Sequence, residues 1–379
     1  MTRNLFASAL IGLTLFSLCT LRTSGQEEKK KPTLILGKTI GEWIKILRTH
    51  ENPKYRRAAL IALEGANEAR STGLPAILDA IEKDKEARVR LDAVNLLGRM
   101  GPEVKPSLKA LVGALQTDKA DEVREAAASY IATKFAEPAA NYVDALVGAL
   151  KDKHAGTRIA VAGALRNLGE NARPAVPALL DAAGNPKEDP QVRGAAIHVI
   201  SRLAKDDPKT LALLVEIAKD AKAARILREA AVDGLGRLGS TAPEVSAVLC
   251  VTLVDKSLEL RKASAAALGA LGVKAKAAWP TIKLRLIQAN EPDSSVRNHL
   301  IHLTGVLGKT LDEAVPALGK VVLDDTSTEN RIAAIQELAE LGARAKSVIP
   351  TLAKVASNDA RFAIREAAEK AVLQIKTAP

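Results

Sequence analysis

Few side chains in this sequence of 379 residues are spaced for chemistry at a single site. His299 and His302 lie three residues apart, which would place both imidazoles on one face of a helix as ligands for a metal ion. Nothing near them in the sequence completes a ligand set. The only two cysteines, Cys19 and Cys250, supply neither a zinc cage nor a disulfide framework. We therefore predict no metal and no cofactor.

Catalytic motifs are equally sparse. The segment 305–310, Gly-Val-Leu-Gly-Lys-Thr, is similar to the end of a phosphate-binding loop. The first glycine of that motif would fall on Leu303, and we expect a helix before it rather than the strand that the loop requires. There is also no zinc-protease helix motif and no nucleophile elbow. The sequence therefore predicts a protein that is not an enzyme.

Composition narrows the classes of ligand. Apolar residues make up 47% of the chain and charged residues 26%, but aromatic residues only 2%. Carbohydrate clefts and single-stranded nucleic-acid platforms stack their ligands on aromatic rings, so both are disfavoured. The formal net charge of +11 favours acidic partners, although it carries no information about the fold.

The first 25 residues resemble a secretory signal. Arg3 precedes an uncharged apolar run from Leu5 to Leu18, and the small residues around Gly25 suit cleavage there. Cleavage next to Cys19 with lipid attachment is an alternative, which the bulky Leu18 disfavours. Retention of the segment as a membrane anchor is a second alternative. No other stretch is apolar enough to span a bilayer. We expect an exported protein, periplasmic or extracellular, with residues 1–25 as signal peptide.

A repeated arginine defines the rest of the chain. It recurs in the same sequence context every 33 to 36 residues. Ten such units occupy residues 39–379 and leave only a charged linker at 26–38. The repeated residues are Arg56, Arg90, Arg124, Arg158, Arg193, Arg228, Arg261, Arg297, Arg331 and Arg365.

Each unit predicts two helices. The first begins near a proline, which a first helical turn tolerates, and the second opens with Val-Arg and ends with Leu-Gly. In the second helix the positions three, four, seven and ten residues after the arginine are apolar, which forms a helical stripe. Neither helix buries its stripe alone, so neighbouring pairs must stack into one core. The predicted fold is all-α, an α-α superhelix of about ten helical hairpins.

The proline, the turn aspartate, the Val-Arg pair and the Leu-Gly end resemble HEAT repeats, especially the subtype named after phycobilisome lyases. An acidic residue stands six before most of the arginines, with Glu291 in place of aspartate once, whereas His50, Lys187 and Lys222 depart from the pattern. We interpret the arginines and these carboxylates as a structural ladder between units. The aspartates are Asp84, Asp118, Asp152, Asp255, Asp325 and Asp359.

Two columns of variable residues follow the arginine, at about five and nine positions beyond it, and are not part of the apolar stripe. In HEAT-like stacks the second helix lines the concave side, so these columns predict a groove for a protein or peptide; a merely solvated face is the alternative. The candidate partner-binding residues, which include the two histidines of one helix, are Asn95, Arg99, Asn167, His198, Arg202, Asp233, Arg237, His299, His302 and Gln336.

A basic stretch offers a second binding hypothesis. Between Arg261 and Gln288 there are six basic residues and no acid. Apart from Arg261 itself they form a candidate patch for an acidic protein or polymer, or else a solvated face: Lys262, Lys274, Lys276, Lys283 and Arg285. Our leading hypothesis is a non-enzymatic exported scaffold with a protein or peptide partner. A polyanion-binding envelope protein is the alternative, and the resemblance also implies a bilin-lyase-like enzyme as a weaker one. Nucleic acid is not an expected partner.

Overall fold

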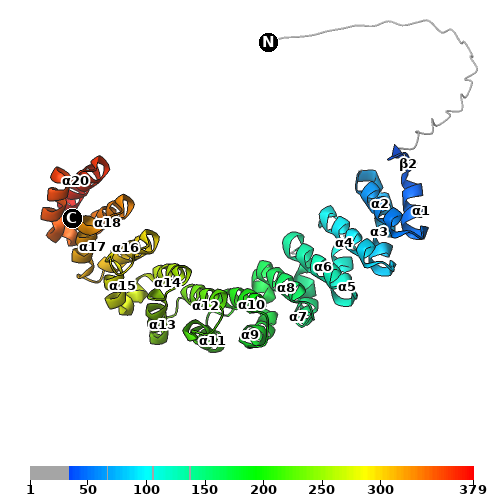
Figure 1. Ribbon diagram of the computed structural model, residues 1–379, viewed down its shortest axis with the longest axis horizontal. Coiled ribbons are helices and arrows are strands. Elements are labelled where there is room, and N and C mark those ends of the chain that lie inside the picture. Colours follow the sequence, from blue (N-terminus) through cyan, green and yellow to red (C-terminus); the bar gives the residue numbers. More distant parts are fainter. Residues whose placement is uncertain (1–33, 66, 105, 136–137) are drawn as a thin grey trace, which may run out of the picture.

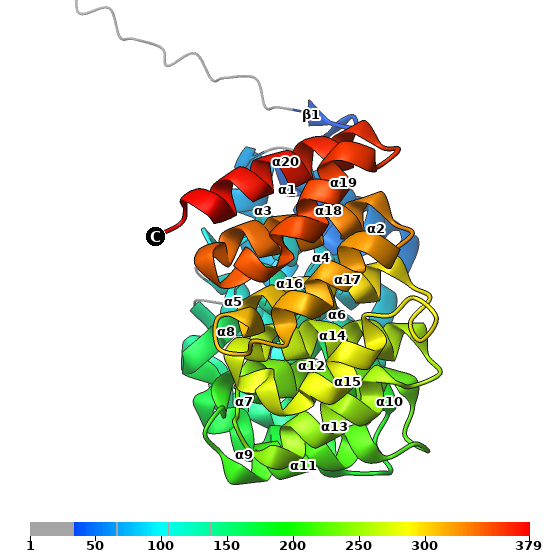
Figure 2. The same cartoon turned by 90° about the vertical axis from the view of Figure 1, so that its left-hand side faces the viewer.

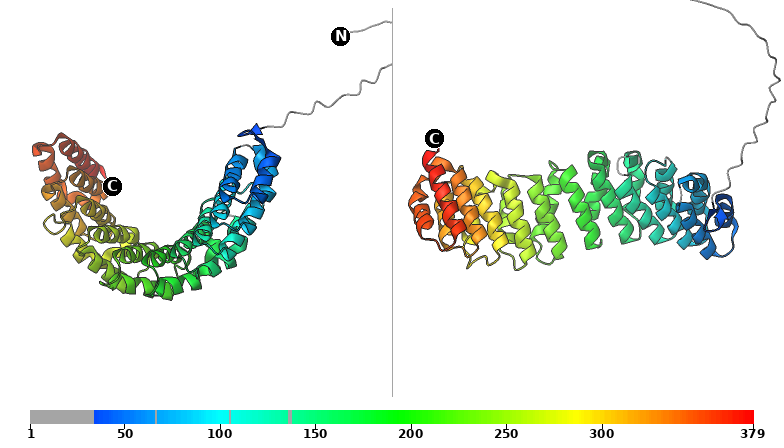
Figure 3. Two further views of the ribbon diagram at one scale, coloured as in Figure 1. Left: turned by 45° about the vertical axis from the view of Figure 1, so that its right-hand side comes forward. Right: turned by 90° about the horizontal axis from the view of Figure 1, so that it is seen from above.

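The structure, a computed structural model, describes residues 34–379 except 66, 105 and 136–137. The expected signal segment and linker residues 26–33 lie outside the described residues. Twenty α-helices of the described chain pair into ten helical hairpins, and the hairpins follow one another around an open arc (Figure 1). Seen from above the arc, successive hairpins lie side by side (Figure 3). The predicted all-α superhelix is confirmed.

The first helix of each hairpin lies on the outer, convex edge of the arc (Figure 1). These helices begin at or near a proline in six repeats, where the missing N–H is one that a helix start leaves unpaired anyway. The outer helices are α1 (Ile40–Thr49), α3 (Asn67–Lys83), α5 (Pro106–Thr117), α7 (Val143–Ala149), α9 (Val176–Gly184), α11 (Pro208–Lys219), α13 (Pro243–Leu253), α15 (Trp279–Arg285), α17 (Ala314–Asp324) and α19 (Ile349–Asn358).

The second helix lies on the inner, concave edge and carries the repeated arginine near its start (Figure 1). Each inner helix packs against its own outer helix and against the inner helices on either side, which Figure 2 shows as layers near the C-terminal end. The inner helices are α2 (Pro53–Glu64), α4 (Ala87–Met100), α6 (Asp121–Lys134), α8 (Ala155–Leu168), α10 (Pro190–Leu203), α12 (Arg225–Leu238), α14 (Leu258–Leu271), α16 (Ser294–Gly308), α18 (Thr328–Glu340) and α20 (Phe362–Thr377).

The core is a continuous apolar layer between the two rows of helices. Leucine, alanine, valine and isoleucine fill it almost entirely; Trp43, Phe135 and Trp279 are its buried aromatic residues among those described. The many small alanine side chains of this layer allow neighbouring helices to approach closely. Because the layer runs through every repeat, each hairpin relies on its neighbours for burial.

A short β-hairpin precedes the first helix of the array. Strands β1 (Leu34–Ile35) and β2 (Lys38–Thr39) form an antiparallel hairpin, with Leu36 and Gly37 in the positive-φ conformations that a tight turn requires. The Trp43 indole N–H donates to the Ile35 carbonyl at 2.7 Å and fixes this hairpin on α1. Thr39 and Glu42 form a capping box at the start of α1. Linker residues 34–38 therefore cover the first repeat.

Several repeats are joined by a short 3₁₀ segment: η1 (Pro138–Tyr142), η2 (Gly169–Ala175), η3 (Gly272–Ala278) and η4 (Gly342–Val348). The last three begin at glycines with positive φ, and Gly239 has positive φ as well, as the Leu-Gly ends predicted. Gly308 is different: it belongs to α16, and a β-carbon there would meet Leu341 Cδ1 at 2.7 Å. No helix among the described residues is long and apolar enough to cross a membrane.

Candidate partner-binding surface

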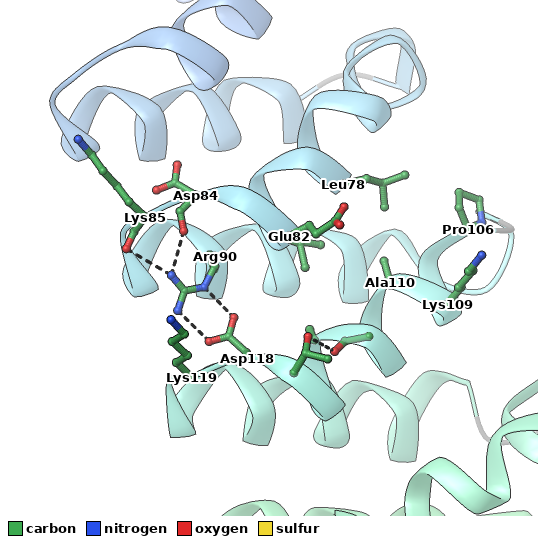
Figure 4. Close-up of a pocket in the computed structure, with 14 residues that line it drawn as sticks. Leu78, Glu82, Asp84, Lys85, Arg90, Pro106, Lys109, Ala110, Asp118 and Lys119 are labelled. Carbon is green, nitrogen blue, oxygen red and sulfur yellow. Dashed lines mark hydrogen bonds and ion pairs between the residues drawn. The ribbon is translucent and has the colours of Figure 1, made fainter.

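The repeated arginines join consecutive repeats. Arg90 of α4 donates from Nε and Nη2 to the two carboxylate oxygens of Asp118 in the next repeat, at 2.7 and 2.8 Å. Its Nη1 donates to the Asp84 carbonyl at 2.9 Å, so the guanidinium also fixes the turn that precedes its own helix (Figure 4). Asp118 in turn accepts from the Ala120 N–H at 2.8 Å. One guanidinium thus holds two turns in register.

This contact recurs along the arc with the carboxylate 27 to 30 residues after the arginine. The described pairs are Arg56–Asp84, Arg90–Asp118, Arg124–Asp152, Arg158–Glu188, Arg228–Asp255, Arg261–Glu291, Arg297–Asp325 and Arg331–Asp359. Burial raises the pKa of Asp118, but the hydrogen bonds from Arg90 and Ala120 outweigh it and hold that pKa below its ordinary value. The same balance lowers the pKa of Asp325.

Three positions depart from a uniform ladder: the turn at Lys187, Arg193, and the last arginine, Arg365, which among the described residues donates only to the Asp359 and Ala360 carbonyls. Lys187 does not supply a carboxylate, but the adjacent Glu188 does, at 2.5 Å from Arg158. Arg193 has no carboxylate partner within the described residues: its Nε donates to the Ala183 carbonyl at 2.8 Å. The ladder carboxylate is therefore missing at Arg193, in line with the departure at Lys222 noted in the sequence. Lys222 occupies the acidic position of the next turn, and no described acid replaces it.

The predicted partner-binding residues all lie on inner helices, but they do not form one cluster. Three of them lie together on α10 and α12, the helices at the middle of the arc (Figure 1). The His198 ring lies 3.7 Å from the Asp233 carboxylate, and Arg237 pairs with the same carboxylate. Arg202 lines the same hollow as His198 and Arg237. The remaining six lie on α4, α8, α16 and α18, spread along the arc.

Three of the six outlying candidates bind neighbouring repeats. Arg99 pairs bidentately with Glu64 of the preceding inner helix, and the Asn167 amide donates to the Ala132 carbonyl at 2.8 Å. His302 lies 2.7 Å from Glu337 of the next repeat. These side chains therefore stabilise the stack as well as line the inner face. Asn95 is half-buried and Gln336 exposed, and no described residue bonds either side chain.

The two histidines of α16 do not converge on a metal. His299 donates to the Ser295 carbonyl of its own helix at 2.8 Å, whereas His302 turns to Glu337. Among residues 34–379, outside the gaps already noted, no group of three potential ligands lies together. The segment 305–310 forms the end of α16 and the turn after it rather than a loop that encircles phosphate. Cys250 is partly buried against the core.

The mid-arc hollow is a basic recess of the inner face. Its volume is about 670 Å³, and Arg166, His198, Arg202, Lys205 and Arg237 line it. Arg166 and Lys205 were missed at the sequence level, because Arg166 stands eight rather than nine residues after its ladder arginine and Lys205 lies beyond the helix end. A second hollow of about 340 Å³ adjoins it and shares Arg166 and His198.

Positive charge predominates at this hollow. Burial, Arg237 and Arg166 lower the pKa of His198 and outweigh Asp233, so the ring is neutral at pH 7. Arg237 pairs with Asp233, but Arg166, Arg202 and Lys205 form no ion pair with any described residue. Glu170 is the one carboxylate lining the hollow, and it bonds Arg173 at 2.8 Å. The hollow therefore retains an excess of positive charge.

The basic stretch that follows Arg261 is not one free patch. Acids from later repeats neutralise most of it: Glu291 binds Arg261 and Arg285, Asp293 lies 3.8 Å from Lys262, and Glu313 pairs with Lys283 at 2.9 Å. The Lys274 ammonium donates to the Gly239 carbonyl at 2.8 Å, which leaves Lys276 without a described partner. The residues also divide between the inner helix α14, segment η3 and the outer helix α15. The prediction of a single patch was wrong because spatial neighbours come from other repeats.

A separate hollow of about 760 Å³ lies on the outer side, between α3 and α5 (Figure 4). Apolar residues such as Leu78 and Ala110 form part of it, while Lys85, Lys109 and Lys119 stand at its edge. The Arg90–Asp118 pair closes one end, so this hollow is a product of the ladder. Lys85, Lys109 and Lys119 form no ion pair with any described residue, but the acid Glu82 shares the lining with them and forms none either, whereas the acid of the mid-arc hollow is bonded to Arg173.

Known proteins share this architecture. A family model for HEAT repeats matches residues 40–132, 109–188, 162–232 and 282–373. Among solved structures, importin beta has a TM-score of 0.60 at 14% identity, over 89% of this chain and 54% of that one. Yeast importin-beta (Kap95p) has 0.54 at 15%, over 89% and 52%. Kap121p bound to Nup53p has 0.53 at 13%, over 89% and 41%.

No curated protein sequence matches the chain. The chain spans about half the length, or less, of the solved proteins that it matches, so the likeness establishes the fold alone. The family model, in contrast, accounts for well over half of the sequence, in the helices that carry the arginine ladder. The chain belongs to the HEAT repeat family.

Proposed function

We propose that this chain is an exported, non-enzymatic scaffold that binds a protein or peptide along the inner face of its arc. The observation that carries the proposal is the column of residues five positions after each ladder arginine. In all ten repeats this residue is at least partly exposed on the inner helix, and its type changes from repeat to repeat. Identical side chains would suffice for solvation alone, whereas a varied column suits recognition by many separate contacts.

The area of the inner face is also large enough for a protein partner. A standard interface takes about 800 Å² from each partner, which a few neighbouring repeats supply. Kap121p is a HEAT-like structure solved with Nup53p bound, so a comparable fold does hold another protein. The mid-arc hollows add recessed contacts to the inner face, one basic and one mainly apolar.

Site-specific photo-crosslinking tests the face directly. Ser129 of α6 and Ala266 of α14 are small, exposed members of the inner column, so a benzoyl-phenylalanine at either position should leave the fold intact. Lys320 of α17 and Lys354 of α19 are matched exposed positions on outer helices. We expect covalent protein adducts from the inner positions in intact cells. Adducts from the outer positions alone, or from none of the four, would contradict the proposal.

Export has its own test. The motivating feature is the apolar run 5–18 in front of Gly25. We expect the chain in the envelope or the medium with a new N-terminus at Gln26, read by N-terminal mass spectrometry. A chain recovered uncleaved from the cytoplasm would refute export without affecting the scaffold. The lyase-type subtype stays a prediction, and transfer of a tetrapyrrole by the purified chain would replace the scaffold with an enzyme.

A further inference from the structure

The middle of the inner face combines two adjoining hollows of opposite character. Arg166, Arg202, Lys205 and Arg237 surround the first, at the C-terminal ends of α8, α10 and α12. The second lies toward the N-terminal ends of the same helices and is mainly apolar. His198 belongs to both and stands between them.

The first hollow has anion-binding groups that the fold itself does not use. Two other arginines exposed on inner helices reach a carboxylate: Arg99 binds Glu64, and Arg57 binds Asp92. Arg166 and Arg202 have no such partner among the described residues, although they line one recess with Lys205 and Arg237. Like charges that share a recess repel one another, and an incoming carboxylate removes that repulsion while it gains charge-assisted hydrogen bonds.

The second hollow exists where two of its helices carry glycine and therefore have no side chain to fill the space. Gly163 of α8 and Gly194 of α10 face it, and a β-carbon on either residue would meet nothing within 4 Å. Ile226 of α12 borders the same space with 47% of its surface exposed. A recess beside a large exposed aliphatic residue suits an apolar side chain of a ligand.

We propose that these hollows form one recognition site for an acidic protein segment, in which carboxylates bind Arg166 and Arg202 while an adjacent apolar side chain enters the recess at Gly163. The inference rests on the proposed scaffold function and specifies its partner by chemistry. Charge complementarity selects an acidic segment, and the apolar recess selects a peptide over a uniformly charged polymer, which has no side chain to place there.

The test begins with a random-peptide display library panned on the immobilised full chain. We expect enriched peptides to carry aspartate or glutamate next to leucine, isoleucine or phenylalanine. Enrichment of basic or uncharged peptides, or no enrichment, overturns the proposal. The most enriched peptide, labelled with fluorescein, then serves as the probe in anisotropy titrations.

Variants separate the two hollows. Arg166→Glu and Arg202→Glu should each weaken the probe about tenfold, as expected for reversal of a charge that contacts a charged ligand. A β-carbon at Gly163 meets nothing within 4 Å, so Gly163→Leu should extend into the apolar recess, favour the helix and also weaken the probe about tenfold. The single variant Lys320→Glu makes the same change in net charge on an outer helix and should bind as the parent does. Equal binding by the parent and the Arg166 and Arg202 variants would overturn the site.

Polyphosphate distinguishes the peptide from a polymer. If it binds as tightly as the probe, competes with it, and is unaffected by Gly163→Leu, the site recognises charge alone and the proposal fails. The scaffold function can survive that failure. If an Arg166→Glu/Arg202→Glu chain still crosslinks its cellular partner from Ala266 in undiminished yield, the scaffold stands and only the acidic-segment site is lost.

Discussion

Arg297 of α16 and Asp325 of the following repeat form a bidentate ion pair, at 2.7 and 2.8 Å, with 1% and 2% of their side chains exposed. Arg297 Nη1 also donates to the Glu291 carbonyl at 2.7 Å. Asp325 accepts from the Ser327 N–H at 2.8 Å, so both partners are satisfied on several sides. This pair is the most buried rung of the ladder, and it contrasts with Arg193, which bonds only a carbonyl.

Arg297→Ala should lower the free energy of unfolding by about 3–5 kcal/mol, because it leaves the Asp325 carboxylate buried without its cation. Arg193→Ala should cost only about 1 kcal/mol, since one hydrogen bond to a carbonyl is lost and no acid is stranded. Urea denaturation followed by circular dichroism at 222 nm, a wavelength at which helix content dominates, checks both. Equal midpoint shifts for the two variants would mean that the ladder carboxylates contribute nothing.

The same carboxylates predict acid sensitivity. Burial raises the pKa of Asp325, but hydrogen bonds from Arg297 and Ser327 lower it more, so the folded-state pKa lies below the unfolded one. A group of this kind stabilises the fold fully above its unfolded pKa, and the contribution disappears as the pH falls through the folded pKa. We therefore expect the urea midpoint to fall between about pH 5 and pH 2.

Asp325→Asn is the control for that profile. It removes one titrating rung, so its midpoint should start lower near neutral pH and change less on acidification than that of the parent chain. A parent midpoint that stays constant down to about pH 2 would show that the ladder pKa values are not lowered.

Helix approach gives a third prediction. At Gly236 of α12, a β-carbon would meet the Ala267 Cα of α14 at 2.8 Å, and backbone cannot move aside as a flexible side chain can. Gly236→Ala should therefore destabilise the chain by about 1–3 kcal/mol. At Gly269 of α14 a β-carbon meets nothing within 4 Å, so Gly269→Ala should stabilise by about 0.5–1 kcal/mol through helix propensity. Thermal unfolding by calorimetry distinguishes the two, and shifts of the same sign would contradict the packing argument.

The fold could be predicted from the sequence because each repeat carries the same residues for the same contacts. A carboxylate placed six residues before one arginine and about 28 after the previous one requires consecutive hairpins in a fixed register, and the structure has that register at Arg90–Asp118. The exceptions are local. Glu188 replaces Lys187 because the turn after α9 is longer, and Gly308 is dictated by contact with Leu341 rather than by backbone conformation.

The candidate surface was less predictable, because charge balance depends on neighbours far away in sequence. The stretch after Arg261 contains no acid, yet Glu291 and Glu313 of later turns neutralise much of it in space. Conversely, Arg166 stays unpaired although it does not stand in the predicted column. The predicted column contains the residues nine positions after each ladder arginine. It therefore omits Arg166, which stands eight positions after Arg158 and lines the same hollow.

Arg193 has no carboxylate partner among the described residues, so adding one in the next turn should stabilise the fold. The turn after α11 matches the turn after α9: Ala223 N–H donates to the Asp220 carbonyl as Glu188 N–H donates to the Asn185 carbonyl, at 3.0 and 3.1 Å. Ala223 therefore occupies the position from which Glu188 reaches Arg158. Ala223→Glu should place a carboxylate beside Arg193 and raise the free energy of unfolding by about 1 kcal/mol, the scale of a partly exposed arginine pair.

Ala221→Glu is the matched control for this repair, because it adds the same charge to the same turn at a fully exposed position two residues away. Its urea midpoint should equal that of the parent chain. The decisive measurement combines Ala223→Glu with Arg193→Ala: the gain should vanish when the arginine is absent, since the new carboxylate then has no cation to bind. A gain that persists in the double variant would show that the glutamate acts through the helix start of α12 and that the rung between Arg193 and the next repeat was never formed.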